Sequence, residues 1–305
     1  MGSERPALKD YYVASSVDEA LAYLSAYRGE AQLMGGGTLL MPRVHRGEIP
    51  ISRLVDISRI CSTRRIIVDG NHLYIGATAS FSTLVKNTPI REQAPIVHDA
   101  ASRMGTPPVR RLATLGGNII SAVGNAHALV ALITLGAEVE ITNLTGSQWL
   151  PVASLSARHG VSRVDSTTEA ITSVRVSRLW PGRGSALQGL NLRETGGRDL
   201  LILGLDLALH EDGETVHRSA AVMGAVGTLP TRLEAAEAAL VGASVHDRAT
   251  LQAFVTPFAE AAHAALEDPL RGAEERVFGL AEDVFHRAVH IALGRSGIDS
   301  DHDGA

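Results

Sequence analysis

The chain has 305 residues, of which 45% are hydrophobic and 20% are charged, and its formal net charge at pH 7 is −5. This composition is ordinary for a soluble protein of two or three packed units, and the negative charge argues against nucleic acid as a partner. A single cysteine, Cys61, excludes an internal disulfide and any metal centre built from paired cysteines. The sequence has no signal-like start and no apolar run near the roughly 20 residues that span a bilayer, so we expect a cytoplasmic protein without a membrane span.

The first part of the chain predicts a helix, two strands and a glycine loop. Ser16 and Glu19 form a capping box ahead of an apolar stripe, so a helix is expected to begin near Val17. Residues 31–34 predict a short strand that runs into three glycines. The alternation of apolar and polar residues over 51–57 predicts a half-buried strand.

The middle of the chain mixes strands and helices. Asp69-Gly70-Asn71 separates two apolar runs, 65–68 and 73–77, which together predict a β-hairpin. Further helices are expected at 80–86, 90–104 and 126–135, and further strands at 137–141, 170–176 and 186–193.

The character of the sequence changes after the stretch 180–185, where we expect a domain boundary. Residues 200–209 and 216–223 predict a second hairpin, and three helices are expected at 230–240, 248–266 and 273–293. Gly242 and Gly294 stand where helices commonly end in a glycine. The polar residues 296–305 predict a disordered tail. The layout is that of an α+β protein.

Two glycine segments carry the chemical information: Met34-Gly35-Gly36-Gly37-Thr38-Leu39-Leu40 and Thr114-Leu115-Gly116-Gly117-Asn118-Ile119. Glycine lacks a Cβ atom, so its N–H group can approach an anion closely. Two such loops, each with a threonine hydroxyl, can clamp a diphosphate from both sides, although glycine clusters also serve as plain turns. Neither segment matches GxGxxG or GxxxxGK[ST], which excludes a Rossmann or P-loop site.

These segments resemble the two flavin loops of the FAD-binding subunits of molybdenum hydroxylases. That family includes carbon monoxide dehydrogenase medium subunits, the flavin part of xanthine dehydrogenase and nicotine dehydrogenase subunits. The C-terminal third is similar as well, through Gly224-Ala225-Val226-Gly227, Pro230-Thr231-Arg232 and Asp268-Pro269-Leu270-Arg271-Gly272. The resemblance covers nearly the whole chain.

The resemblance implies a two-subdomain FAD-binding fold of the vanillyl-alcohol-oxidase-like (PCMH) type over 1–182, with subdomains of about 1–58 and 59–182. A C-terminal domain of a sheet and helices would follow over 183–295. It further implies an electron-transfer subunit that carries FAD. Electrons would come from molybdopterin on a large partner subunit through [2Fe-2S] clusters on a small one, and would pass to an external acceptor.

The same resemblance implies that no residue of this chain is catalytic and that none holds a metal. The implied cofactor-binding residues are Met34, Gly35, Gly36, Gly37, Thr38, Leu39, Leu40, Thr114, Gly116, Gly117, Asn118, Ile119, His127 and Arg193.

Three positions depart from the family pattern. Leu39 replaces an acidic or polar residue, His127 stands where an acid is usual, and Arg193 follows Asn191-Leu192 where many relatives have a lysine. These departures keep two alternatives open, which are a stand-alone flavin oxidoreductase and a scaffold subunit that has lost FAD.

Some residues have two interpretations. Arg110 and Arg111 can meet a pyrophosphate or a partner, or be solvated. Asp199 can orient the flavin edge or form a turn, and His286 with His290 can bind a metal or simply face solvent. The organic substrate, the terminal acceptor and the stoichiometry cannot be inferred from this chain.

Overall fold

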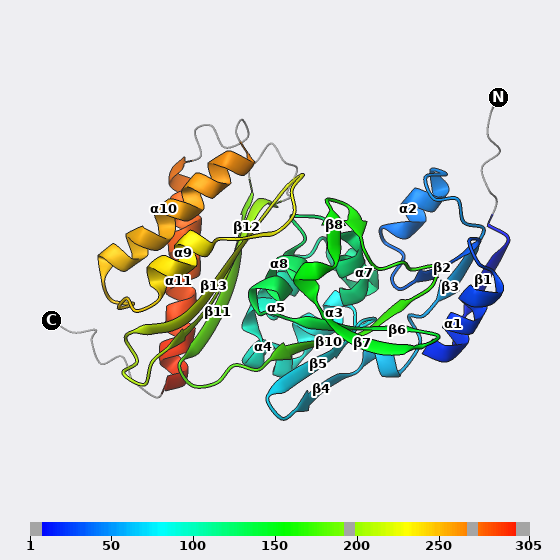
Figure 1. Cartoon of the computed structure of the whole chain (residues 1–305), viewed down its shortest axis with the longest axis horizontal. Coiled ribbons are helices and arrows are strands. Elements are labelled where there is room, and N and C mark those ends of the chain that lie inside the picture. The colour runs from blue at the N-terminus through cyan, green and yellow to red at the C-terminus, as the bar shows by residue number, and fades with distance from the viewer. Residues whose placement is uncertain (1–7, 192–198, 267–273, 297–305) are drawn as a thin grey trace. The chain divides into compact units, whose positions relative to one another are not determined.

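The computed structural model describes residues 8–191, 199–266 and 274–296, which form two compact units (Figure 1). The first unit comprises Met1–Asn87, Met104–Ala122 and Ala137–Val176. The second comprises Thr88–Arg103, Val123–Gly136 and Ser177–Ala305. The units therefore divide after Val176, close to the expected boundary, but two earlier segments also belong to the second unit.

A small parallel sheet begins the first unit. Its order is β1-β3-β2, and its elements are β1 (Asp10–Val13), α1 (Val17–Ala26), β2 (Ala31–Met34), α2 (Leu40–His45) and β3 (Arg53–Asp56). The predicted capping box is present at the start of α1, where the Glu19 amide donates to Ser16 Oγ at 3.1 Å. Leu21 and Leu24 of α1 pack with Val55 of β3 in one apolar cluster.

A second, antiparallel sheet of order β4-β5-β10-β6-β7 completes the strand layers of the first unit. Its strands are β4 (Ile66–Asp69), β5 (His72–Gly76), β6 (Glu138–Asn143), β7 (Gly146–Pro151) and β10 (Ala170–Ser177). The hairpin predicted around Gly70 is confirmed, because β4 pairs with β5 and Gly70 has a φ of +53°. The short strands β8 (Ser156–Arg158) and β9 (Val161–Ser162) pair with each other.

Beside α1 and α2, the first unit contains three further short helices among the described residues: α3 (Phe81–Lys86), α6 (Pro107–Leu112) and α7 (Leu115–Ser121). The last of these corrects the prediction for the second glycine segment. It is not a loop but the first turn of α7, capped by the Thr114 side chain. Seven residues with two glycines give too short a pattern for a helix to be recognised from the sequence.

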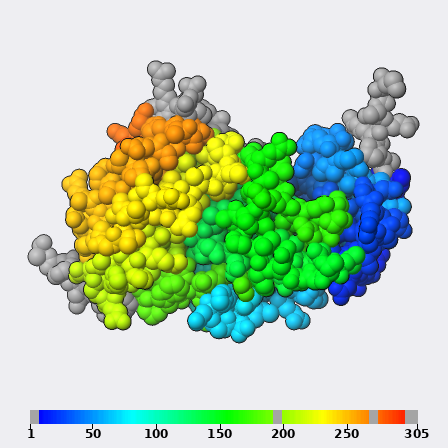
Figure 2. All heavy atoms as spheres, in the orientation of Figure 1, coloured from blue at the N-terminus to red at the C-terminus, as the bar shows by residue number. Residues whose placement is uncertain are grey.

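A four-stranded antiparallel sheet of order β11-β12-β13-β14 forms the centre of the second unit. Its strands are β11 (Arg183–Asn191), β12 (Asp199–Leu209), β13 (Val216–Ala225) and β14 (Thr231–Arg232). Three helices cover one face of it: α9 (Glu234–Leu240), α10 (Arg248–Ala265) and α11 (Glu274–Ser296). In Figure 2, α9 and α10 form the yellow-to-orange surface of this unit. Alternate residues of β12, such as Leu203 and Leu205, pack toward these helices.

The opposite face of this sheet is also covered. The helices α4 (Thr88–Gln93), α5 (Pro95–Arg103) and α8 (His127–Thr134) belong to the same unit, and α5 and α8 contact its strands. A Cβ atom on Gly204 of β12 would lie 2.5 Å from Thr134 Oγ1 of α8. Because both faces are buried, β12 carries an almost continuous apolar run.

Two further expectations about helices need correction. The single helix expected over 90–104 is two helices, α4 and α5, since Pro95 lacks the N–H that would continue the first. Gly294 lies inside α11 rather than after it, whereas Gly242 follows α9 with a φ of +81° as expected.

The predicted tail 296–305, beyond Ser296, and Arg193 lie outside the described residues. Within the described helices, none has the length and apolar composition needed to cross a bilayer.

Candidate functional site

The two glycine segments, some 80 positions apart in the sequence, lie against each other in the first unit. A Cβ atom on Gly36 would stand 1.8 Å from the backbone oxygen of Leu112, and one on Gly35 would stand 2.9 Å from Thr114 Oγ1. No side chain larger than hydrogen fits at Gly36 without moving the backbone of Leu112 and Ala113, which lead directly into the second segment. The glycines therefore allow a close approach between the segments, and Gly37 adds a left-handed turn with a φ of +69°.

The backbone donors of the two segments differ. In the second segment, the Gly116 amide donates to Ala77 O at 2.8 Å and the Gly117 amide donates to Thr114 Oγ1 at 3.2 Å. In the first segment, the amides of residues 35–39 donate to no group in the part of the chain that the structure describes. The half-buried first segment is thus the one that retains N–H groups for an external acceptor.

Asn118 of the second segment adds an unsatisfied acceptor. It lies in the first turn of α7 and is 6% exposed, and its side-chain oxygen Oδ1 has no hydrogen-bond partner among the described residues. A buried amide oxygen without a partner costs free energy unless a ligand or water supplies an N–H or O–H group. A ligand that carries both phosphate oxygens and O–H or N–H groups would satisfy the free backbone donors and the side-chain acceptor.

Four other predicted residues flank this place in different ways. Met34 ends β2 and is 9% exposed, and Leu40 begins α2. Leu39 is 53% exposed, so its apolar side chain does not belong to the core, whereas Ile119 of α7 is 1% exposed and packs inside. Of these, the exposed Leu39 is the one whose side chain a ligand could cover.

His127 belongs to the second unit, where it begins α8. Its Nε2 atom lies 2.7 Å from Asp199 Oδ2, and both side chains are almost buried. Arg103 Nη1 lies 3.9 Å from the same carboxylate oxygen, and Asn125 Nδ2 donates to the Asp199 backbone oxygen at 2.9 Å. Asp199 therefore joins α5, α8 and β12 and is more than a turn residue.

Sequence reasoning missed the partner of His127, which is Asp199, 72 positions further along the chain. Arg103, which also lies near the Asp199 carboxylate, is far from Asp199 in the sequence, and no local pattern links these residues. Arg110, one of the candidate pyrophosphate ligands, instead donates through Nη1 to the backbone oxygens of Met104 and Gly105. No group of three or more metal-ligating side chains occurs among the described residues, which include His286 and His290 of α11.

Comparisons with known proteins agree with the chemistry of the glycine segments. The family model described as "FAD binding domain in molybdopterin dehydrogenase" matches residues 6–178. The chain is 30% identical to the 6-hydroxypseudooxynicotine dehydrogenase complex subunit alpha of Paenarthrobacter nicotinovorans, over 87% of each protein. It is 27% identical to the carbon monoxide dehydrogenase medium chain of Hydrogenophaga pseudoflava, over 95% of this chain and 99% of that one.

Solved structures give the same result at the level of the fold. A chain of the carbon monoxide dehydrogenase from Hydrogenophaga pseudoflava that lacks the Mo-pyranopterin moiety superposes with a TM-score of 0.81 at 26% identity, covering 96% of this chain and 99% of that one. A chain of quinoline 2-oxidoreductase from Pseudomonas putida 86 has the same fold, with a TM-score of 0.79 at 22% identity. The expected fold, a PCMH-type FAD-binding domain followed by a sheet-and-helices domain, is confirmed.

Proposed function

Because the chain belongs to the family of FAD-binding domains of molybdopterin dehydrogenases, we propose that it is the flavin subunit of a molybdenum hydroxylase complex and passes electrons through FAD to an external acceptor. The oxidised organic substrate would not contact this chain. The relatives named above are parts of dehydrogenases, which places the chain among oxidoreductase components.

The observation that carries the proposal is the unequal hydrogen bonding of the two glycine segments. The unbonded amides of residues 35–39 would donate to the FAD pyrophosphate, each charge-assisted bond contributing about 1.5–3 kcal/mol. The Gly116 and Gly117 amides already donate within the protein, so the second segment would hold the first segment in place rather than bind the pyrophosphate through these amides. The side chains of Thr114 and Asn118 in the second segment would add contacts to the cofactor.

The remaining proposed contacts involve side chains. Leu39, Met34 and Leu40 would offer apolar surface, and Thr38 a hydroxyl. Buried Ile119 would support the site from behind. His127, held by Asp199, would present a fixed imidazole ring, since one of its nitrogens is already engaged. Arg193 would supply a cation.

When bound, FAD supplies the redox chemistry, accepting and releasing electrons, while the protein binds and orients it. The residues of this chain would hold the cofactor, and its backbone amides would pair with the phosphates, in a protein whose formal net charge is −5. The partners we propose are a large subunit with molybdopterin and a small subunit with [2Fe-2S] clusters. This proposal is supported by the carbon monoxide dehydrogenase relative, which is named the medium chain of its enzyme. The single cysteine requires that the iron–sulfur clusters lie on another chain.

Purification from the native source, with cofactor analysis, tests the proposal. We expect FAD in this chain and co-purification with one iron–sulfur chain and one molybdopterin chain. FAD with no such partners would favour a stand-alone flavin oxidoreductase. Partners without FAD, and an isolated chain that binds added FAD more weakly than about 1 mM, would favour a scaffold subunit.

A further inference from the structure

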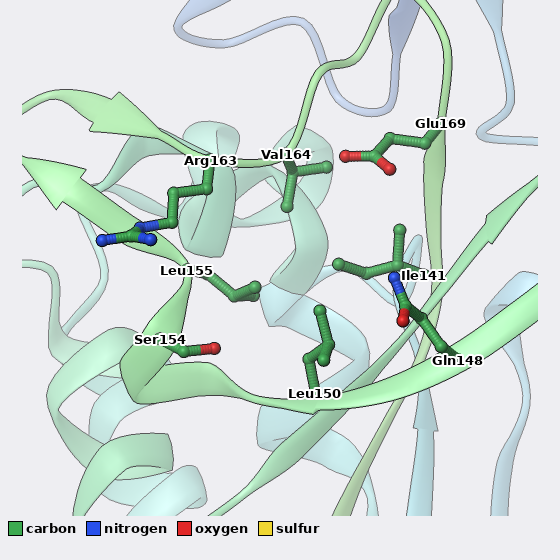
Figure 3. A pocket seen from close by; sticks show the side chains of 8 residues that line it. All are labelled: Ile141, Gln148, Leu150, Ser154, Leu155, Arg163, Val164 and Glu169. Carbon is green, nitrogen blue, oxygen red and sulfur yellow. The ribbon is translucent and has the colours of Figure 1, made fainter.

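A pocket of about 310 Å³ lies in the first unit, between the β6–β7 hairpin and the segment that follows it (Figure 3). All its lining residues fall between positions 141 and 169, so it is built from one continuous stretch of the chain. None of them is among the residues we assign to FAD. The volume is at the lower end of the range for small-ligand sites.

The floor of the pocket is apolar. Ile141, Leu155 and Val164 line it and are 3%, 2% and 6% exposed, respectively. In Figure 3 their side chains point into the space between the polar groups. A ligand that rests on this floor would have to present hydrocarbon in its middle.

Opposite charges stand on opposite sides of this floor. Figure 3 shows Arg163 at one side, with its guanidinium pointing away from the apolar side chains, and Glu169 at the other, with its carboxylate pointing toward Val164. Gln148 lies on the side of Glu169. The Arg163 guanidinium pairs with no carboxylate among the described residues. Glu169 accepts the Asp165 amide at 3.0 Å through Oε1 only, which leaves its other oxygen for a ligand.

From this arrangement we propose that the pocket binds an unbranched ω-amino carboxylic acid. The exposed Arg163 side chain would turn toward the floor and pair with the carboxylate of the ligand. The ammonium group would pair with Glu169 and the Gln148 amide oxygen, and the methylene chain would cover the apolar floor. A simple anion would leave its far end facing the Glu169 carboxylate, and a simple cation would face the arginine. Only a ligand with both charges, separated by hydrocarbon, satisfies both sides.

Calorimetric titration of the full-length, FAD-loaded protein with 6-aminohexanoate tests this inference. We expect saturable binding, with hexanoate and hexylamine binding at least about tenfold more weakly, since each lacks one charge-assisted contact. Absence of binding at about 10 mM, where a site with a Kd of about 1 mM would be filled, would overturn the inference. Equal binding of hexanoate would overturn it as well.

Variants locate the binding. Arg163→Gln and Glu169→Gln should each weaken binding of 6-aminohexanoate about tenfold. Arg158→Gln, an exposed arginine on β8 that does not line the pocket, is the matched control and should leave binding unchanged. If the control weakens binding as much as Arg163→Gln, the ligand is held elsewhere. The FAD absorbance of each variant reports separately on the proposed function and is expected to stay the same.

Discussion

At the scale of single residues, Gly36 has the least room for a Cβ atom among the described glycines. A Cβ atom there would meet the Leu112 backbone oxygen at 1.8 Å, so Gly36→Ala must displace the backbone of one segment. We expect a loss of about 1–3 kcal/mol in the free energy of unfolding and weaker FAD binding. Urea denaturation and FAD titration measure both effects. The matched control is Gly279→Ala within α11, where a Cβ atom meets nothing, and it should stabilise by about 0.5–1 kcal/mol. A Gly36→Ala protein as stable as the wild type would contradict the close approach of the segments.

Glu19 gives a residue-level prediction about pH. Its carboxylate accepts from the Ser15 hydroxyl and amide and from the Tyr12 hydroxyl, and these bonds lower the pKa of Glu19 from its ordinary 4.5 to about 2. A lowered folded-state pKa contributes stability above pH 4.5 that is lost as the pH falls toward 2. The wild type should therefore melt above Glu19→Gln at pH 7, and the difference should shrink between pH 4.5 and 3. A difference that grows on acidification would argue against this bond network.

At the scale of elements, a buried charge cluster ties β11, β12 and β13 together. Asp206 of β12 accepts from Arg183 of β11 at 2.8 and 3.0 Å and from Arg218 of β13 at 3.0 Å. Arg183 and Asp206 are 0% and 1% exposed, and the Arg183 guanidinium also lies 4.3 Å from the centre of the Trp180 ring. Arg183 further donates to the backbone oxygens of 177 and 178, so it fixes the start of β11.

Removing one partner of this cluster should cost far more than removing a surface pair. We expect Arg183→Met to destabilise by about 3–5 kcal/mol, because the Asp206 carboxylate then stays buried with a single cation. The double variant Arg183→Met/Asp206→Leu should recover part of this loss. Arg46→Gln, which breaks the exposed pair with Glu48, should cost less than about 1 kcal/mol. Denaturation midpoints of the four proteins give the comparison, and similar losses for Arg183→Met and Arg46→Gln would contradict it.

Elements that are marked by a short stretch of sequence could be predicted. The capping box at Ser16, the turn at Gly70 and the apolar run of β12 each sit in one stretch of sequence, and the structure has all three. By contrast, the sequence gives no comparable signal for β1 and β7. The strand β7 is largely exposed, combines Trp149 and Leu150 with polar residues without alternation, and ends in Pro151, so it lacks the pattern of a half-buried strand.

The sequence carries no comparable local signal for how elements that are remote in the chain pack against each other. That α5 and α8 cover the sheet of the second unit depends on which apolar surface they meet, and periodicity does not reveal it. For the site, the residues of both glycine segments could be chosen from the sequence. The sequence could not show which backbone amides remain free, because the Gly116 amide donates to Ala77 O, and Ala77 is remote in the sequence.

At the scale of the whole molecule, the glycine segments assigned to FAD lie in the first unit, so cofactor binding should stabilise the two units unequally. A ligand at 100 times its Kd stabilises the state that binds it by about 2.7 kcal/mol, which slows exchange through unfolding about 100-fold. We expect hydrogen exchange of the core amides of β3, in the first unit, to slow by this factor when FAD is added to the apo-protein. The amides of residues 35–39 should change from fast to slow exchange, because they donate to no described group without FAD, whereas the Gly116 amide is protected throughout. Core amides of β12, in the second unit, should slow less, since that unit contains His127 but neither glycine segment. Equal slowing in both units would mean that they unfold as one, and unchanged exchange at 35–39 would remove the first segment from the FAD site.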